Sequence, residues 1–163
     1  MPHELFSRPA FSLTPESGRT GPKLWVRRLV IWREPNDKIR DVSLQPGLNI
    51  IWSPDSESRD APIGHGSGKT TFCRLLRFCL GEDSFAPDDL RHRIGEKLPR
   101  GYVGAEILLE GEVWLVLRSL GDRRRDTVIE GGTLDTIFET DPTPTGIEPL
   151  RQALTKAIVG DAV

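Results

Sequence analysis

The chain has 163 residues, of which 37% are hydrophobic and 28% are charged, and its formal net charge is −2. This length allows one domain with a substantial core, and the near-neutral charge excludes a general electrostatic attraction to nucleic acid. No apolar run approaches the roughly 18 residues that a membrane-spanning helix requires, and the N-terminal residues lack the pattern of a signal peptide. We therefore expect a cytoplasmic protein that does not insert into a membrane.

The N-terminal third of the sequence predicts an arm followed by strands. Residues 1–22 are rich in Pro, Ser, Thr and Gly, which predicts a flexible N-terminal arm before a lobe that spans residues 23–163. The β-branched and aromatic residues of "KLWVRRLVIW" predict one strand, and "KIRDVSL" predicts a second. The short apolar run Leu48–Trp52 predicts a third strand, of the kind that is buried on both faces of a sheet.

A polar stretch, residues 53–68, separates this run from a predicted helix over residues 69–80. Apolar side chains recur there at the spacing of one helix face, and Gly81 follows as a C-terminal cap. The face consists of Phe72, Leu75, Leu76 and Cys79. The helix contains both cysteines of the chain, Cys73 and Cys79, which lie too far apart for a disulfide and are expected to be reduced packing residues.

The C-terminal half predicts an antiparallel β-subdomain over about residues 102–130. A short helix over residues 88–93 is expected first, in a loop. The hydrophobic alternation of "YVGAEILLEGEVWLVLRSLG" predicts a hairpin that turns at Glu110-Gly111, and "DTVIEGG" predicts a further antiparallel strand. A final helix is expected over about residues 148–158, with Leu150, Leu154 and Ile158 on its apolar face.

The string Gly66-Ser67-Gly68-Lys69-Thr70-Thr71 has the composition of a phosphate-binding loop at the start of a helix. Its glycines allow the backbone to approach an anion closely, and successive N–H groups can surround a β-phosphate. Lys69 would supply an ammonium group to the β- and γ-phosphates, and the Thr70 hydroxyl would bind Mg²⁺. We therefore predict a nucleotide site made of Gly64, Gly66, Ser67, Gly68, Lys69, Thr70 and Thr71, with Thr70 as the metal-binding residue.

The usual phosphate-loop pattern has a glycine at the position that Ile63 occupies here. In that pattern the preceding strand ends at the first glycine, whereas here a polar insert, residues 53–63, comes between them. A longer connection removes the need for one tight turn, and Gly64 can take over part of the role of the missing glycine. Because the insert is rich in charged residues, one interpretation is that it covers the nucleotide, and the alternative is a passive surface loop.

Two strands, the string Gly47-Leu48-Asn49, the phosphate loop and a helix that ends in "RFCLGE" follow one another in this chain. From Leu24 to about Arg118, this order resembles the N-terminal half of an ATPase head of the SMC/RecF-like, ABC-type group of AAA family ATPases. It is most similar to a poorly characterised bacterial subgroup of that group. The resemblance implies an α/β fold, namely the N-terminal lobe of a P-loop NTPase with an antiparallel β-subdomain.

The same resemblance implies ATP and Mg²⁺ as cofactors and head-to-head dimerisation around ATP, with a protein partner or second lobe. It also implies work on DNA, in repair, chromosome maintenance or phage defence. It further places Arg27, Arg28 and Asn36 near the nucleoside.

The acidic residues that such a head uses for hydrolysis are not found in the sequence. "VWLVLRSL" has the apolar run of a Walker B strand but no acid, and "TLDTIFETD" has acids but no such run. The sequence also contains no "LSGGQ"-like signature and no switch histidine. We therefore expect no catalytic residue in this chain, and ATP hydrolysis only when a second lobe supplies the Walker B and signature motifs.

Two alternatives remain open at this point. A standalone P-loop kinase or NTPase would need an acidic Mg²⁺ ligand at a strand end and an arginine-rich lid, for which Asp135 and Arg123–Arg125 are the candidates. A non-catalytic interaction protein would keep ATP only as a structural ligand.

Overall fold

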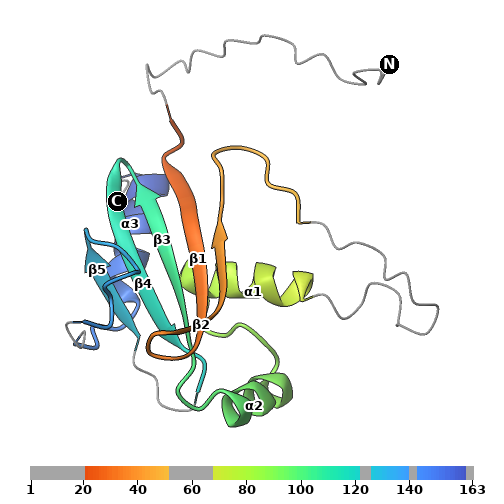
Figure 1. Cartoon of the computed structure of the whole chain (residues 1–163). Coiled ribbons are helices and arrows are strands. Elements are labelled where there is room, and N and C mark those ends of the chain that lie inside the picture. Colours follow the sequence, from red (N-terminus) through yellow and green to blue (C-terminus); the bar gives the residue numbers. More distant parts are fainter. Residues whose placement is uncertain (1–20, 52–67, 122–125, 140–142, 161–163) are drawn as a thin grey trace, which may run out of the picture.

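One antiparallel sheet and three helices make up the part of the chain that the computed structural model describes, residues 21–51, 68–121, 126–139 and 143–160 (Figure 1). The sheet order is β2-β1-β3-β4-β5. Its strands are β1 (Leu24–Glu34), β2 (Asp37–Ser43), β3 (Tyr102–Leu109), β4 (Glu112–Ser119) and β5 (Thr127–Glu130). The helices are α1 (Lys69–Cys79), α2 (Asp88–Lys97) and α3 (Glu148–Val159). The mixed α/β composition is thereby confirmed. The strands over residues 102–130 are antiparallel as predicted, but they belong to the same sheet as β1 and β2 and do not form a separate subdomain.

The hairpin of β3 and β4 forms as the hydrophobic alternation predicts. The strands pair from Tyr102 opposite Ser119 to Leu109 opposite Glu112. The two residues between them, Glu110 and Gly111, both have positive φ angles, 51° and 99°. Paired positive φ angles twist a two-residue turn in the same sense as the strands, so the expected turn at Glu110-Gly111 is confirmed.

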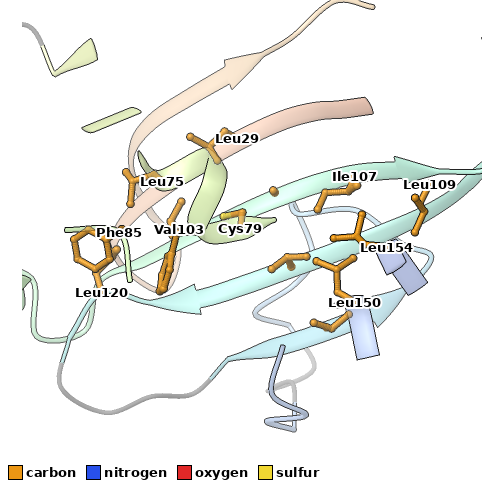
Figure 2. Packing of buried hydrophobic residues seen from close by; sticks show 14 of the residues in the cluster. Leu29, Leu75, Cys79, Phe85, Val103, Ile107, Leu109, Leu120, Leu150 and Leu154 are labelled. Atoms are coloured by element: carbon orange, nitrogen blue, oxygen red, sulfur yellow. The ribbon is translucent and has the colours of Figure 1, made fainter. Parts of the chain in front are cut away.

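The inner face of the sheet, which we define as the face covered by α1 and α3, carries the larger hydrophobic core (Figure 2). Alternate residues of β3 point into it, from Val103 to Leu109, and all are less than 5% exposed. Helix α1 contributes Leu75, Phe78 and Cys79, and α3 contributes Leu150, Leu154 and Ala157. Both helices therefore pack against side chains of β3 and β4 that are distant from them in the sequence.

Helix α3 forms over the predicted span, but only part of its predicted apolar face is buried. Leu150 and Leu154 are buried, whereas Ile158 is 63% exposed. Ala157, one residue earlier, completes the buried face instead. The reason is geometric, because a spacing of three or four residues keeps one helix face, and the step from Leu154 to Ala157 satisfies it as well as the step to Ile158.

The outer face of the sheet carries a second core, which we call the outer core, made of Val30, Trp32, Leu115, Leu117, Leu134 and Ile137. Leu134 and Ile137 belong to the segment after β5, which covers this face. The indole of Trp32 meets the ring of Phe138 edge-on, with ring centroids 5.3 Å apart. The segment after β5 therefore buries a sheet face that solvent would otherwise reach.

The third predicted strand, Leu48–Trp52, is wrong for residues 48–51, and Trp52 lies outside the described residues. Residues 48–51 have no strand structure, and Leu48 and Ile50 are 85% and 79% exposed. The Asn49 side chain accepts a hydrogen bond from the Gln45 N–H at 2.8 Å and donates to the Gln45 carbonyl at 2.8 Å. These local bonds compete with strand pairing.

The two cysteines have opposite environments, although both were expected to be packing residues. Cys73 is exposed and Cys79 is buried, and both are free thiols. Burial raises the pKa of the Cys79 thiol to about 12, and a thiol reacts only through its thiolate.

We therefore expect the folded protein to react with one equivalent of a thiol reagent at about pH 8. Cys73 should react rapidly, and Cys79 should react only when the protein is unfolded. A colorimetric disulfide-exchange assay with Cys73→Ser as the control measures this directly. Rapid labelling of the folded Cys73→Ser variant would contradict the buried position of Cys79.

Candidate functional site

The first turn of α1 contains four of the predicted nucleotide-binding residues. Gly68 is the N-cap and adopts the left-handed conformation, with φ 75° and ψ 6°. Its carbonyl accepts the first helical hydrogen bond from the Phe72 N–H, at 2.8 Å. Among the described residues, a Cβ added at position 68 would meet no atom within 4 Å apart from its chain neighbours, so the backbone angle is what favours glycine there.

The electrostatics of this first turn suit an anion. The N–H groups of a first turn have no acceptor inside the helix, and they carry the positive end of the helix dipole. Of the three helices in the described ranges, α2 and α3 have acidic residues in the first turn, and α1 has none. The positive end of α1 is therefore not neutralised by its own first turn.

The predicted side chains of this turn lie at the surface. Thr70 is exposed, and Lys69 and Thr71 are partly exposed. Gly64, Gly66 and Ser67 lie outside the described residues, as does the insert 53–63. The structure therefore brings together Gly68, Lys69, Thr70 and Thr71 at one helix end, and the remaining predicted contacts are not placed.

The opposite end of α1 is held by a buried arginine that the sequence did not single out for this role. Arg118 of β4 is 2% exposed, and its guanidinium lies 3.5 Å from the centroid of the Phe78 ring. Its Nη1 donates to the carbonyls of Phe78 at 2.6 Å and Glu82 at 2.5 Å. Its Nε and Nη2 donate to Asp126, at 3.1 and 2.9 Å. The sequence did contain one signal for the burial of Arg118. Along β4 it alternates with Trp114 and Val116, whose side chains point to the inner face of the sheet.

A second arginine, Arg151 of α3, contacts the residues that follow α1. Its Nε donates to the Gly81 carbonyl at 2.8 Å, its Nη2 also donates to that carbonyl, and Nη2 pairs with Asp83 at 2.5 Å. No local sequence pattern predicts this contact, since 70 residues separate Gly81 from Arg151. The C-terminal end of α1 is thus fixed by side chains from both β4 and α3.

A cavity of about 140 Å³ lies beside this C-terminal end, with Phe78, Asp83, Arg91 and Asp126 among its lining residues. Its charged groups are already engaged. Asp126 pairs with Arg118 at 2.9 Å, and Arg91 pairs with Asp88 at 3.0 Å. The cavity is at the opposite end of α1 from the predicted phosphate contacts, so we do not assign it to the nucleotide.

A cluster of charged side chains occupies the outer face of the sheet, and we call it the outer ion cluster: Arg27, Arg28, Lys38, Asp41, Glu106 and Asp135. A β-bulge between Val26 and Arg28 allows Arg27 and Arg28 both to reach Glu106. Glu106 also accepts hydrogen bonds from the Leu134 N–H and the Thr133 hydroxyl, at 3.0 and 3.1 Å. These contacts fasten the segment after β5 to the sheet.

This cluster bears on two of the expectations from sequence. Arg27 and Arg28 bind carboxylates on the outer face, whereas α1 packs on the inner face. These contacts do not support an approach of the two arginines to a nucleoside, which stays a prediction. Asp135, the acid considered as a Mg²⁺ ligand, pairs with Arg28 at 2.9 Å and Lys38 at 2.8 Å. Asp135 is therefore engaged on the outer face of the sheet, whereas Thr70 belongs to α1, which packs on the inner face. Arg123–Arg125 lie outside the described residues.

The outer ion cluster predicts a pH dependence of stability. Hydrogen bonds from Arg28 and then Lys38 lower the pKa of Asp135 and of Asp41. Burial opposes a lowered pKa at Glu106, but hydrogen bonds from Leu134, Arg27 and Thr133 outweigh it and lower that pKa as well. A carboxyl group whose pKa is lower in the folded state stabilises the fold above its ordinary pKa, and this contribution is lost as the pH falls.

We therefore expect the free energy of unfolding to fall between about pH 5 and pH 3. The double variant Asp41→Asn, Asp135→Asn should have a shallower dependence over that range, and Asp89→Asn, which lies outside the cluster, should follow the wild type. Urea unfolding at several pH values measures the slope. Equal slopes for the double variant and the wild type would contradict a stabilising role for these ion pairs.

No protein-family model matches the chain, and no curated protein or solved structure matches it either. None of the helices in the described part is both long and apolar enough to cross a lipid bilayer. Within the same ranges, no three His, Cys, Asp or Glu side chains are grouped in a way that could hold a metal ion.

Proposed function

We propose that the chain binds Mg-ATP through its phosphates at the start of α1, as one lobe of an SMC/ABC-like ATPase. The observation that carries the proposal is the first turn of α1. A left-handed Gly68 leads directly into Lys69 and Thr70, in a turn without acidic residues. Backbone N–H groups, the helix dipole and a lysine at one helix end form a typical site for a phosphate group.

The residues present fit the proposed cofactors. Lys69 would hold the β- and γ-phosphates, and the Thr70 hydroxyl, which is at the surface, would bind Mg²⁺. Gly64, Gly66 and Ser67 would add backbone N–H groups to the same phosphates. Mg²⁺ keeps most of its water shell and needs few protein ligands, so one hydroxyl from this lobe is sufficient for binding.

The exposed run of Leu48, Ile50 and Ile51 supports the part of the proposal that requires a second lobe. Its residues favour β structure, and they are 85%, 79% and 41% exposed. Large apolar side chains in a row at the surface are typical of a site that another protein surface covers. We propose that a second lobe pairs with this run and supplies the Walker B acid and the signature motif. From the resemblance alone, we further propose that the assembled ATPase acts on DNA.

Binding is tested by titrating Mg-ATP into the wild type and two lysine variants. We expect Lys69→Ala to lose at least about tenfold in affinity, because a charge-assisted phosphate contact disappears. Lys97→Ala, which removes a lysine from the last turn of α2, should bind like the wild type. Equal affinity of Lys69→Ala and wild type would refute the assignment of the site to α1.

The second lobe is tested by hydrolysis and by copurification. The isolated chain should bind Mg-ATP without turning it over, and turnover should appear only with a partner that carries a Walker B acid. The double variant Leu48→Asp, Ile50→Asp should lose that partner. Ile158→Asp, which changes another exposed apolar side chain, on α3, should retain it. Turnover by the isolated chain would instead favour a standalone NTPase.

A further inference from the structure

The packing of α1 is concentrated in its last two turns. Its fully buried residues are Leu75, Phe78 and Cys79, whereas Lys69 to Thr71 are partly or fully exposed and Phe72 packs against the core only partly buried. Figure 1 shows the N-terminal end of the helix extending past the β2 edge of the sheet. The fully buried contacts of α1 therefore lie toward its C-terminal end, and the N-terminal end, where only Phe72 packs in part, follows as part of a rigid rod.

Arg118 and Arg151 act on that C-terminal end from two different elements. Arg118 joins the carbonyls of Phe78 and Glu82 to Asp126, and Arg151 joins Gly81 to Asp83. Both cations lie near the negative end of the α1 dipole, which favours their position. Two fixed guanidinium groups restrict tilt and rotation of a helix more than apolar contacts alone, because their hydrogen bonds are directional.

The geometry of the helix converts a small tilt at this end into a displacement at the other. The Cα atoms of Lys69 and Phe78 are about 14 Å apart along an ideal helix axis, so a tilt of about 5° moves the first turn by about 1 Å. A binding site that uses backbone N–H groups tolerates displacements of only about 0.5 Å.

We propose that Arg118 and Arg151 are positioning residues for the nucleotide site: they fix the C-terminal end of α1, and so the place of Lys69 and Thr70, without touching the nucleotide. This inference rests on the function proposed above. It makes α3, which contributes Arg151, part of the nucleotide-binding lobe. It also makes the contacts of Gly81 and Glu82 determinants of affinity.

The test uses Arg151, because Arg118 is buried and its variants can fail to fold. Fluorescence titration with labelled Mg-ATP should show an affinity about threefold to tenfold lower for Arg151→Ala than for the wild type. Arg151→Lys, which can still donate to the Gly81 carbonyl, should stay within about twofold. The control is Ile137→Val or Ile137→Ala in the outer core, whichever matches the stability of Arg151→Ala, and it should keep wild-type affinity.

A second readout requires no nucleotide. The amide signals of Lys69, Thr70 and Thr71 in a ¹H–¹⁵N spectrum should shift in Arg151→Ala and not in the stability-matched control. Wild-type affinity in Arg151→Ala, or an equal loss in the Ile137 control, would overturn the positioning role and leave the proposed function intact. Failure of the wild type to bind Mg-ATP would overturn the proposed function itself.

Discussion

Replacement of Arg118 by alanine should lower the free energy of unfolding by about 3–5 kcal/mol, the typical cost of removing one partner of a buried ion pair. The side chain of Asp126 is only 11% exposed and would lose its partner. The carbonyls of Phe78 and Glu82 would also lose a donor. Urea unfolding at neutral pH measures the change.

The matched control is Arg91→Ala, because Arg91 forms a surface pair with Asp88 in which the Arg91 side chain is 39% exposed. Exposed pairs contribute about 0–1 kcal/mol, so this variant should be close to the wild type. The double variant Arg118→Ala, Asp126→Ala should cost less than the sum of its single changes, since it removes both charges. Similar losses in Arg118→Ala and Arg91→Ala would contradict the buried geometry of Arg118.

Replacement of Trp32 by alanine should also cost about 3–5 kcal/mol, through the lost burial of the indole and the cavity that it leaves. Within the part of the chain that the structure describes, Trp32 is the largest fully buried side chain, at 1% exposed. It contacts Phe138, and a Cβ added at Gly104 would lie 2.8 Å from its ring. Chemical unfolding at 25 °C, monitored by circular dichroism, measures the loss.

Trp114→Ala provides the comparison, because Trp114 is only partly buried against the inner core. Its cost should be smaller than that of Trp32→Ala, in proportion to the smaller apolar area removed from water. Gly104→Ala should destabilise as well, by roughly 1–3 kcal/mol, since the added methyl group overpacks the outer core. A Trp32→Ala variant as stable as Trp114→Ala would show that the outer core is not packed as described.

Local patterns predicted most of the elements because their causes are local. The alternation from Val103 to Leu109 and the Glu110-Gly111 turn specify the hairpin without reference to the rest of the chain. The apolar spacing of α1 similarly specified its span to within one residue, but only part of its buried face: Leu75 and Cys79 are buried as predicted, and Phe78 is buried as well. Phe72 and Leu76 are only partly buried. At Leu48–Ile51 the apolar composition predicted a strand that does not form. No strand in the described ranges pairs with this run, and the Asn49 side chain hydrogen-bonds the backbone of Gln45 instead.

The long-range contacts could not be read from such patterns. Arg151 meets Gly81 because α1 and α3 both pack on the inner face of the sheet, and Asp135 meets Arg28 and Lys38 because the segment after β5 folds over the outer face. Each contact depends on tertiary placement, which period and propensity do not encode. The start of α1 was predictable, since a glycine that takes a positive φ and a helix N-terminus are both local features.

The central claim is that the first turn of α1 holds the phosphates of a nucleotide, and an NMR titration tests it most directly. Mg-ADP and AMP should be added separately to ¹⁵N-labelled protein while the amide signals are followed. We predict that Mg-ADP shifts the signals of Gly68, Lys69, Thr70 and Thr71 most strongly, and that AMP, which lacks a β-phosphate, leaves them almost unchanged. Absence of any shift, or shifts confined to the other end of α1, would contradict the account.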